Sequence, residues 1–218
     1  IYIITGDGES GIYFLSGPSL LGGYRPTLGV LKTFDGGDTW YRTGLDIDTA
    51  LLVRPYDLKI HPTNPDILFA VTSDSIYRTT DGGITWPGVQ GGFFFDIEFK
   101  PGQPDTMYAS TQTNVFLSTD NGITWTATTD PNFPIGNSSR IELAVSPAND
   151  RWVYAIAGDD AGPVQGFIGL YRSADHGVSW NQQSNTPNIL SSRFNGSGAT
   201  GQAFYDLALA VNPSNLAV

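Results

Sequence analysis

"RTTDGGITW", residues 78–86, decides how this chain folds, because close relatives of the stretch occur at three other places in the sequence. All four copies follow one pattern, Ser/Thr-x-Asp-x-Gly-x-Thr/Ser-Trp, and their tryptophans lie 46, 39 and 55 residues apart. The pattern begins at Thr33, Thr79, Ser118 and Ser173. A repeat of this spacing predicts an array of similar structural units rather than one irregular core.

A β-hairpin pattern precedes each of the last three copies. Residues 56–72, 95–111 and 141–157 each alternate apolar and polar positions, turn at Pro, Asn or Asp, and continue as an apolar run. Each repeat therefore has an inner strand A, a turn, strand B, a loop, strand C, the Asp-Gly box and strand D. Units of this size and order predict an all-β fold, a β-propeller of four-stranded antiparallel blades whose C–D hairpins carry the box.

The whole chain, 1–218, is predicted to be part of one propeller domain, an incomplete arc of about four blades. Three blades occupy approximately 56–86, 94–127 and 140–182, with partial blades at 1–42 and 205–218. Both ends look cut from something longer, and the end strands of such an arc are exposed edges. We therefore expect the remaining blades to come from the same chain or another one.

Composition excludes several classes of function. The formal charge is −10, from 21 acidic and 11 basic residues, so a phosphate backbone is repelled and nucleic acid is excluded as a partner. No apolar run approaches the roughly 20 residues that cross a bilayer, so membrane insertion is not expected. With no cysteine, disulfides and thiolate metal sites are excluded. The 26 glycines and 14 prolines suit short strands joined by tight turns.

The boxes match the Asp-box, or BNR repeat. The chain resembles the propeller blades of sialidases, xyloglucanase-type glycoside hydrolases, sortilin-type receptors and secreted bacterial proteins. Residues 5–10 and the stretch "GVLKTFDGGDTW", residues 29–40, which ends in the first box, resemble the sequences of bacteroidete proteins exported by type IX secretion. The resemblance implies an extracellular or cell-surface location. It does not imply one activity, because several activities share this fold.

The aspartate, glycine and tryptophan that recur in the four boxes are predicted to have structural roles. The aspartate accepts backbone N–H bonds across the turn, the glycine takes a backbone conformation costly for other residues, and the tryptophan packs between blades. These residues are Asp35, Gly37, Trp40, Asp81, Gly83, Trp86, Asp120, Gly122, Trp125, Asp175, Gly177 and Trp180. No box has the alternating carboxylates of a calcium loop, so no cofactor is expected there. Calcium is conceivable only at Asp7/Glu9 or Asp159/Asp160.

The candidate ligand face is the end of the sheets away from the boxes. Because successive strands are antiparallel, the A–B turns share an end with the boxes, and the B–C and D–A loops share the other end. Two B–C loops are long, at 6–28 and 158–168. Aromatic, acidic and basic side chains in these loops suit sugar rings or a peptide. The candidates are Glu9, Tyr24, Arg54, Phe94, Phe133, Arg140, Asp160, Phe167, Arg193 and Phe194.

The favoured function is a module that binds a glycan or a partner protein, with three enzyme or receptor alternatives. The xyloglucanase-type resemblance implies catalytic aspartates at Asp7 and Asp159, but both Gly-Asp settings lack the family's double glycine. Their carboxylates would have to lie roughly 5–9.5 Å apart. A sialidase would use Arg54, Arg140 and Arg193, but its Arg-Ile-Pro motif is absent, and a sortilin-like peptide receptor has cysteines that this chain lacks.

Overall fold

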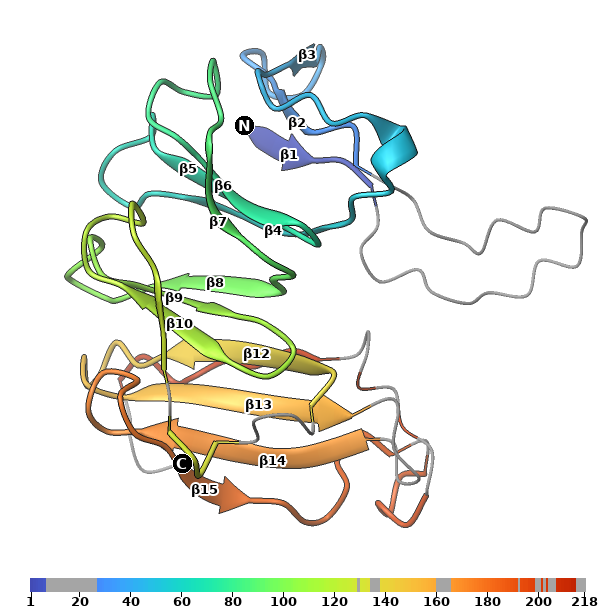
Figure 1. The fold of residues 1–218 in the computed structure, drawn as a ribbon, viewed down its shortest axis with the longest axis vertical. Helices are drawn as coiled ribbons and strands as arrows, with labels where there is room; N and C mark the ends of the chain where they lie inside the picture. Colours follow the sequence, from blue (N-terminus) through green and yellow to red (C-terminus); the bar gives the residue numbers. More distant parts are fainter. Residues whose placement is uncertain are drawn as a thin grey trace, which may run out of the picture. The chain divides into compact units, whose positions relative to one another are not determined.

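The structure is a computed structural model, and it describes residues 1–6, 27–128, 130–133, 138–159, 166–191, 193–198, 201, 203 and 207–214. Within these residues all regular structure is β, apart from one short 3-10 helix, η1 (Thr49–Leu51). The strands form four antiparallel sheets in which chain neighbours are paired (Figure 1). The chain divides into two compact units, unit 1 (Ile1–Phe94) and unit 2 (Phe95–Val218), and each is described by itself.

Unit 1 holds a three-stranded and a four-stranded sheet. The first contains β1 (Tyr2–Ile4), β2 (Val30–Lys32) and β3 (Tyr41–Arg42). The second contains β4 (Pro55–Ile60), β5 (Leu68–Thr72), β6 (Ser75–Thr79) and β7 (Gly88–Gly91). Val30 and Leu45 pack with Leu68 and Trp86 in one buried cluster. The tryptophan of the second box therefore lies against residues of the preceding sheet.

Unit 2 repeats this arrangement with two four-stranded sheets. One contains β8 (Asp96–Phe99), β9 (Met107–Ser110), β10 (Val115–Ser118) and β11 (Thr126–Ala127). The other contains β12 (Arg140–Val145), β13 (Val153–Asp159), β14 (Gly166–Ser173) and β15 (Asn181–Ser184). Tyr108 of β9, Ile141 of β12 and Trp180 share a buried cluster. The predicted all-β fold of antiparallel blades in A-B-C-D order is confirmed.

The Asp81 carboxylate holds the second box closed. Its Oδ1 accepts hydrogen bonds from the Thr79 hydroxyl (2.7 Å) and from the backbone N–H groups of Ile84 and Thr85 (both 2.9 Å). Its Oδ2 accepts from the Thr85 hydroxyl at 2.7 Å. Gly83 has φ = +93°, a region that favours glycine. Its carbonyl accepts from Nε1 of Trp86 at 3.2 Å, so the turn also fixes the tryptophan ring.

The boxes are tied to the A–B turns of their own sheets. The backbone N–H of Gly82 donates to the Asp66 carbonyl at 2.9 Å. The equivalent bonds run from Asn121 to Asp105 (2.8 Å) and from His176 to Arg151 (3.0 Å). In these three sheets the A–B turn and the box therefore lie at the same end. The B–C and D–A connections leave from the other end of each sheet.

Acid should weaken the boxes. Hydrogen bonds from Thr124, first from its side chain and then from its backbone, lower the pKa of Asp120 from 3.8 to about 2. Because the folded pKa lies below the unfolded value, this stabilisation is present above about pH 4 and is lost as the pH falls toward 2. Thermal unfolding followed by circular dichroism from pH 6 to pH 2 should show a falling midpoint in this window. An Asp120→Asn chain should start lower at pH 6 and fall less, and an equally steep fall would contradict the role of this carboxylate.

Removing the fourth box tryptophan should be costly. Trp180 is 1% exposed and lies among Tyr108, Ile141 and Tyr171. We expect Trp180→Ala to lower the free energy of unfolding by about 3–5 kcal/mol, because it leaves a cavity in the core. Val178→Ala is the control, since Val178 is two residues away in the same box and 62% exposed. Urea unfolding should show a loss for the control within about 0.5 kcal/mol, and equal losses for both variants would contradict this account.

Candidate functional site

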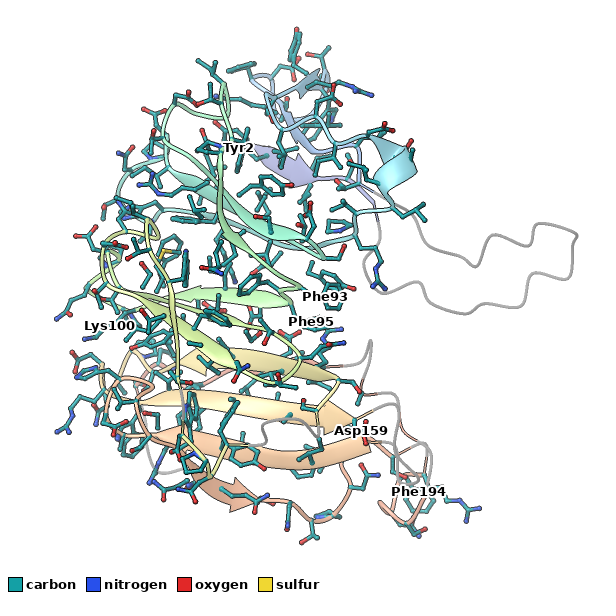
Figure 2. All side chains as sticks on the ribbon, viewed as in Figure 1. Tyr2, Phe93, Phe95, Lys100, Asp159 and Phe194 are labelled. Atoms are coloured by element: carbon teal, nitrogen blue, oxygen red, sulfur yellow. The ribbon has the colours of Figure 1, made fainter. Side chains whose placement is uncertain are left out.

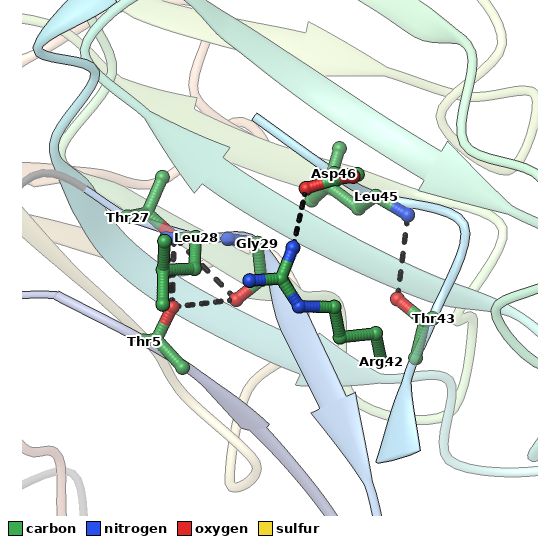
Figure 3. Close-up of polar contacts among 8 residues, drawn as sticks. All are labelled: Thr5, Thr27, Leu28, Gly29, Arg42, Thr43, Leu45 and Asp46. Carbon is green, nitrogen blue, oxygen red and sulfur yellow. Dashed lines mark hydrogen bonds and ion pairs between the residues drawn. The ribbon is translucent and has the colours of Figure 1, made fainter. Parts of the chain in front are cut away.

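The base of the long 6–28 loop is anchored by two threonines (Figure 3). Thr5 donates to the Gly29 carbonyl from its backbone N–H (3.1 Å) and from its hydroxyl (3.0 Å), and it accepts from the Leu28 N–H (2.9 Å). Thr27 accepts from the Gly29 N–H at 2.8 Å, while its own N–H donates to the Val53 carbonyl at 2.8 Å. The two ends of the loop are thus held together, beside the chain that leads into β4.

Arg54, the residue after Val53, belongs to a cluster of one cation and two aromatic rings. The Arg54 guanidinium carbon lies 5.0 Å from the ring centre of Phe93 and 6.0 Å from that of Tyr56. The two rings meet edge to face with centres 5.4 Å apart. The Ser73 N–H donates to the Arg54 carbonyl (2.8 Å) and the Arg54 N–H donates to the Ser73 hydroxyl (2.9 Å), which holds the arginine at the end of β5. All three side chains of this Arg54 cluster (Arg54, Tyr56, Phe93) are half-buried, so part of each side chain is exposed.

Phe94, a candidate from the sequence, is fully buried in unit 1, whereas its neighbour Phe93 is half-buried in the Arg54 cluster. The backbone explains the difference, since adjacent residues in an extended segment point to opposite sides. Sequence reasoning did not select Tyr56 as a site residue. The signal for it was its position at the start of inner strand A, two residues after Arg54.

Phe133 and Arg140 are also buried, at 4% and 5% exposed. The Phe133 ring packs on Trp180, with centres 4.8 Å apart. Arg140 donates through Nε to the Glu142 carboxylate at 2.8 Å and lies over the Phe95 ring at 5.6 Å. Within unit 2, Phe133 therefore contributes to packing and Arg140 to a buried ion pair. Neither side chain belongs to an exposed ligand face.

Asp159 closes β13 at the end of the sheet away from the box. Its Oδ1 accepts a hydrogen bond from the Ser139 hydroxyl at 3.1 Å. The register of the β13–β14 pair shifts between Ala157 and Gly158, immediately before it. Asp7, the other candidate catalytic residue, lies outside the described residues, as do Glu9, Tyr24 and Asp160. The structure therefore gives the position of one candidate carboxylate and no distance between the pair.

Three remaining candidates lie on the loop side of unit 2. The backbone N–H of Phe167 donates to Asn188 at 2.9 Å, and the Phe167 ring packs in part against a cluster containing Ile156. Arg193 and Phe194 are exposed, the latter completely (Figure 2).

Among the described residues, no three His, Asp or Glu side chains are grouped to hold a metal ion. Nor does this part of the chain contain a helix long and apolar enough to cross a membrane.

The Arg140–Glu142 pair should matter for stability. Because Arg140 is buried, Glu142→Ala removes a carboxylate that pairs with it inside the fold, and we expect a loss of about 3–5 kcal/mol in the free energy of unfolding. Asp46→Ala is the matched control, because it removes the partner of Arg42 in a pair whose side chains are 58% and 67% exposed. That variant should lose no more than about 1 kcal/mol. Similar losses in the two variants, measured by urea unfolding, would contradict this difference.

Comparison with known proteins supports the fold. A family model described as the BNR/Asp-box repeat matches residues 116–127. No curated protein sequence matches the chain significantly. An ancestral GH74 enzyme is 19% identical over 75% of this chain and 22% of its own, with a TM-score of 0.60. A GH74 enzyme from Niastella koreensis is 22% identical over 70% of this chain and 25% of its own, with a TM-score of 0.51.

The chain thus spans about a quarter of the length of these two enzymes. At this level of identity the likeness shows a shared fold, and it does not show whether the activity is shared. The likeness to YCF48 from Cyanidioschyzon merolae, 20% identical over 59% of this chain and 36% of that one, has a TM-score of 0.41 and carries no argument. The four boxes, the blade order and the repeat match at residues 116–127 together show that this chain contains Asp-box (BNR) repeats and has a β-propeller fold.

Proposed function

We propose that the chain is a secreted or cell-surface propeller module that binds a glycan or a partner protein at the B–C/D–A end of its blades. The Arg54 cluster carries this proposal, because it places a guanidinium and two aromatic rings beside the anchored base of the 6–28 loop. Extracellular location and type IX export belong to the same proposal. They rest on the resemblance of residues 5–10 and 29–40 to exported bacteroidete proteins. The proposal includes no cofactor.

A glycan is the ligand class that this cluster fits best. Sugar rings present apolar C–H faces that pack on aromatic side chains, and their hydroxyls accept hydrogen bonds from a guanidinium. The net charge of −10 disfavours highly acidic polysaccharides, because like charges repel at long range. We therefore expect neutral polysaccharides to bind in preference to acidic ones. A protein partner would use the same half-buried aromatic and arginine residues as anchors.

The second candidate function is glycoside hydrolysis of the xyloglucanase type. Two observations favour it: the fold likeness to two GH74 enzymes, and the position of Asp159 at the end of β13 where a B–C loop begins. In that reaction one carboxyl group protonates the leaving oxygen, and the other acts as base or nucleophile. Asp7 would be the second carboxylate. No contact among the described residues favours the sortilin-like alternative.

Mutating the Arg54 cluster should weaken binding. In a panel of neutral and acidic polysaccharides measured by titration calorimetry, Phe93→Ala and Arg54→Ala should each raise the Kd for the bound polysaccharide about tenfold or more, as expected for central anchors. Phe34→Ala is the control, because Phe34 is 74% exposed and lies within the first box, at the other end of the blades in unit 1. Equal effects of Phe34→Ala and Phe93→Ala would place the ligand elsewhere. Binding to no glycan would leave a protein partner as the ligand.

New reducing ends, measured in the same incubations, separate the two candidate functions. If release is seen and disappears in Asp159→Asn and Asp7→Asn, the hydrolase is supported and its two carboxylates are identified. If glycan binds without release, the chain is a binding module. Release that persists in both variants would exclude these two residues as the catalytic pair.

A further inference from the structure

A hollow of about 420 Å³ lies between the first and second boxes, within unit 1. One wall carries Phe34 and Tyr41, whose ring centres are 5.9 Å apart, and the other wall is the second box, including Gly82 and Ile84. A hollow of this size is in the range of small-molecule sites in proteins. Because it lies at the box end of the blades, it is a different place from the Arg54 cluster.

The two rings of this hollow are exposed because of their places in the repeat. Phe34 is 74% exposed and Tyr41 55%. The equivalent positions in the second and fourth boxes are exposed as well: Thr80, Pro87, Ala174 and Asn181. Each of those two boxes belongs to a sheet that packs on a preceding sheet of its own unit. These positions therefore face solvent beside a neighbouring blade too, and the first box differs in carrying an aromatic ring at both of them.

A half-buried ammonium lies beside the rings. Nζ of Lys32 is 4.8 Å from the ring centre of Phe34 and 4.9 Å from that of Tyr2. It donates to the Gly82 carbonyl at 3.3 Å, and the Tyr2 hydroxyl donates to the same oxygen at 3.0 Å. In the part of the chain that the structure describes, no carboxylate lies within ion-pair distance of this ammonium. Since an ammonium has three N–H donors, Lys32 can donate to an anion as well.

The other charged groups that line the hollow are engaged within the protein. Arg42 donates to the Asp46 carboxylate at 2.9 Å (Figure 3). Asp81 accepts hydrogen bonds inside its own box, above all from Thr85, and these hold its pKa well below the usual range. Lys32 is therefore the charge in this hollow that a ligand can neutralise, and it selects an anion.

We propose that the hollow binds a small aromatic carboxylate, with the carboxylate on Lys32 and the ring packed against Phe34 and Tyr41. Aromatic rings attract one another in offset or edge-to-face arrangements, and a charge-assisted hydrogen bond is roughly twice as strong as a neutral one. The net charge of −10 repels anions at long range, so we expect a single negative charge to be favoured over several. This site does not depend on the ligand proposed for the Arg54 cluster.

A pair of probes that differ in charge tests the proposal. Hydrocinnamate carries a ring and a carboxylate, and hydrocinnamide replaces the carboxylate with a neutral amide. In NMR titrations of the 218-residue chain, hydrocinnamate should shift the backbone N–H signals of Gly44, Gly82 and Gly83, which line the hollow. Hydrocinnamide should bind at least about tenfold more weakly, because it cannot pair with Lys32. Equal binding of the two probes, or no shift of these signals up to the solubility limit, would overturn the proposal.

The other boxes supply substitutions that this fold accepts. Lys32→Leu places in the first box the residue that precedes the third box, Leu117, and Phe34→Thr places there the residue of the second box, Thr80. Lys32→Leu should raise the Kd for hydrocinnamate at least about tenfold, and Phe34→Thr about fivefold.

Arg151→Leu is the control for net charge, since it removes an exposed cation of unit 2, and it should leave the Kd unchanged. All three variants should keep the remaining N–H signals of the parent chain, which shows that they fold. Equal effects of Lys32→Leu and Arg151→Leu would overturn the proposal, as would unchanged binding in both Lys32→Leu and Phe34→Thr.

Discussion

The aspartate of each box is the constraint on which the blades depend. In the second box, both oxygens of Asp81 are used within the turn, accepting from two hydroxyls and two backbone N–H groups. That closure presents the Gly82 N–H to the Asp66 carbonyl, joining the C–D hairpin to the A–B hairpin of the same sheet. It also orients Trp86, whose ring packs among Val30 and Leu45. One carboxylate thus sets a turn, a link within the blade and a contact with the preceding one.

The same saturation of hydrogen bonds removes the box carboxylates from chemistry. A general acid needs a pKa near the working pH, whereas the hydroxyl and N–H donors hold the pKa values of Asp35, Asp81 and Asp120 below the usual range. These carboxylates are therefore ionised at neutral pH, and their oxygens already accept hydrogen bonds within the turn. The boxes and the A–B turns are joined at one end of each four-stranded sheet, and the B–C and D–A connections leave from the other end. That is where the long loops, Arg54 and Asp159 lie.

The sequence was sufficient to predict the repeat, the strand order and the end of the blades that carries the boxes. Those features depend on local turn chemistry and on strand alternation, which residues such as Asp81 and Gly83 reveal directly. The choice between Phe93 and Phe94 was not predictable in the same way. It depends on which side of an extended segment meets a packed sheet, and that is decided by residues distant in sequence. Arg140 was placed on the correct end, but its burial depends on Glu142 and Phe95.

Repetition itself determines which face of each blade is apolar. Each blade is built to be covered on both faces, so an unpartnered blade presents the same apolar positions that its neighbours bury. Ile3 and Ala70 are equivalent positions, yet Ile3 is 40% exposed while Ala70 is completely buried. A blade of the same repeat beside the first sheet would cover Ile3 in the way that the first sheet covers Ala70, because equivalent positions carry the apolar side chains in each blade.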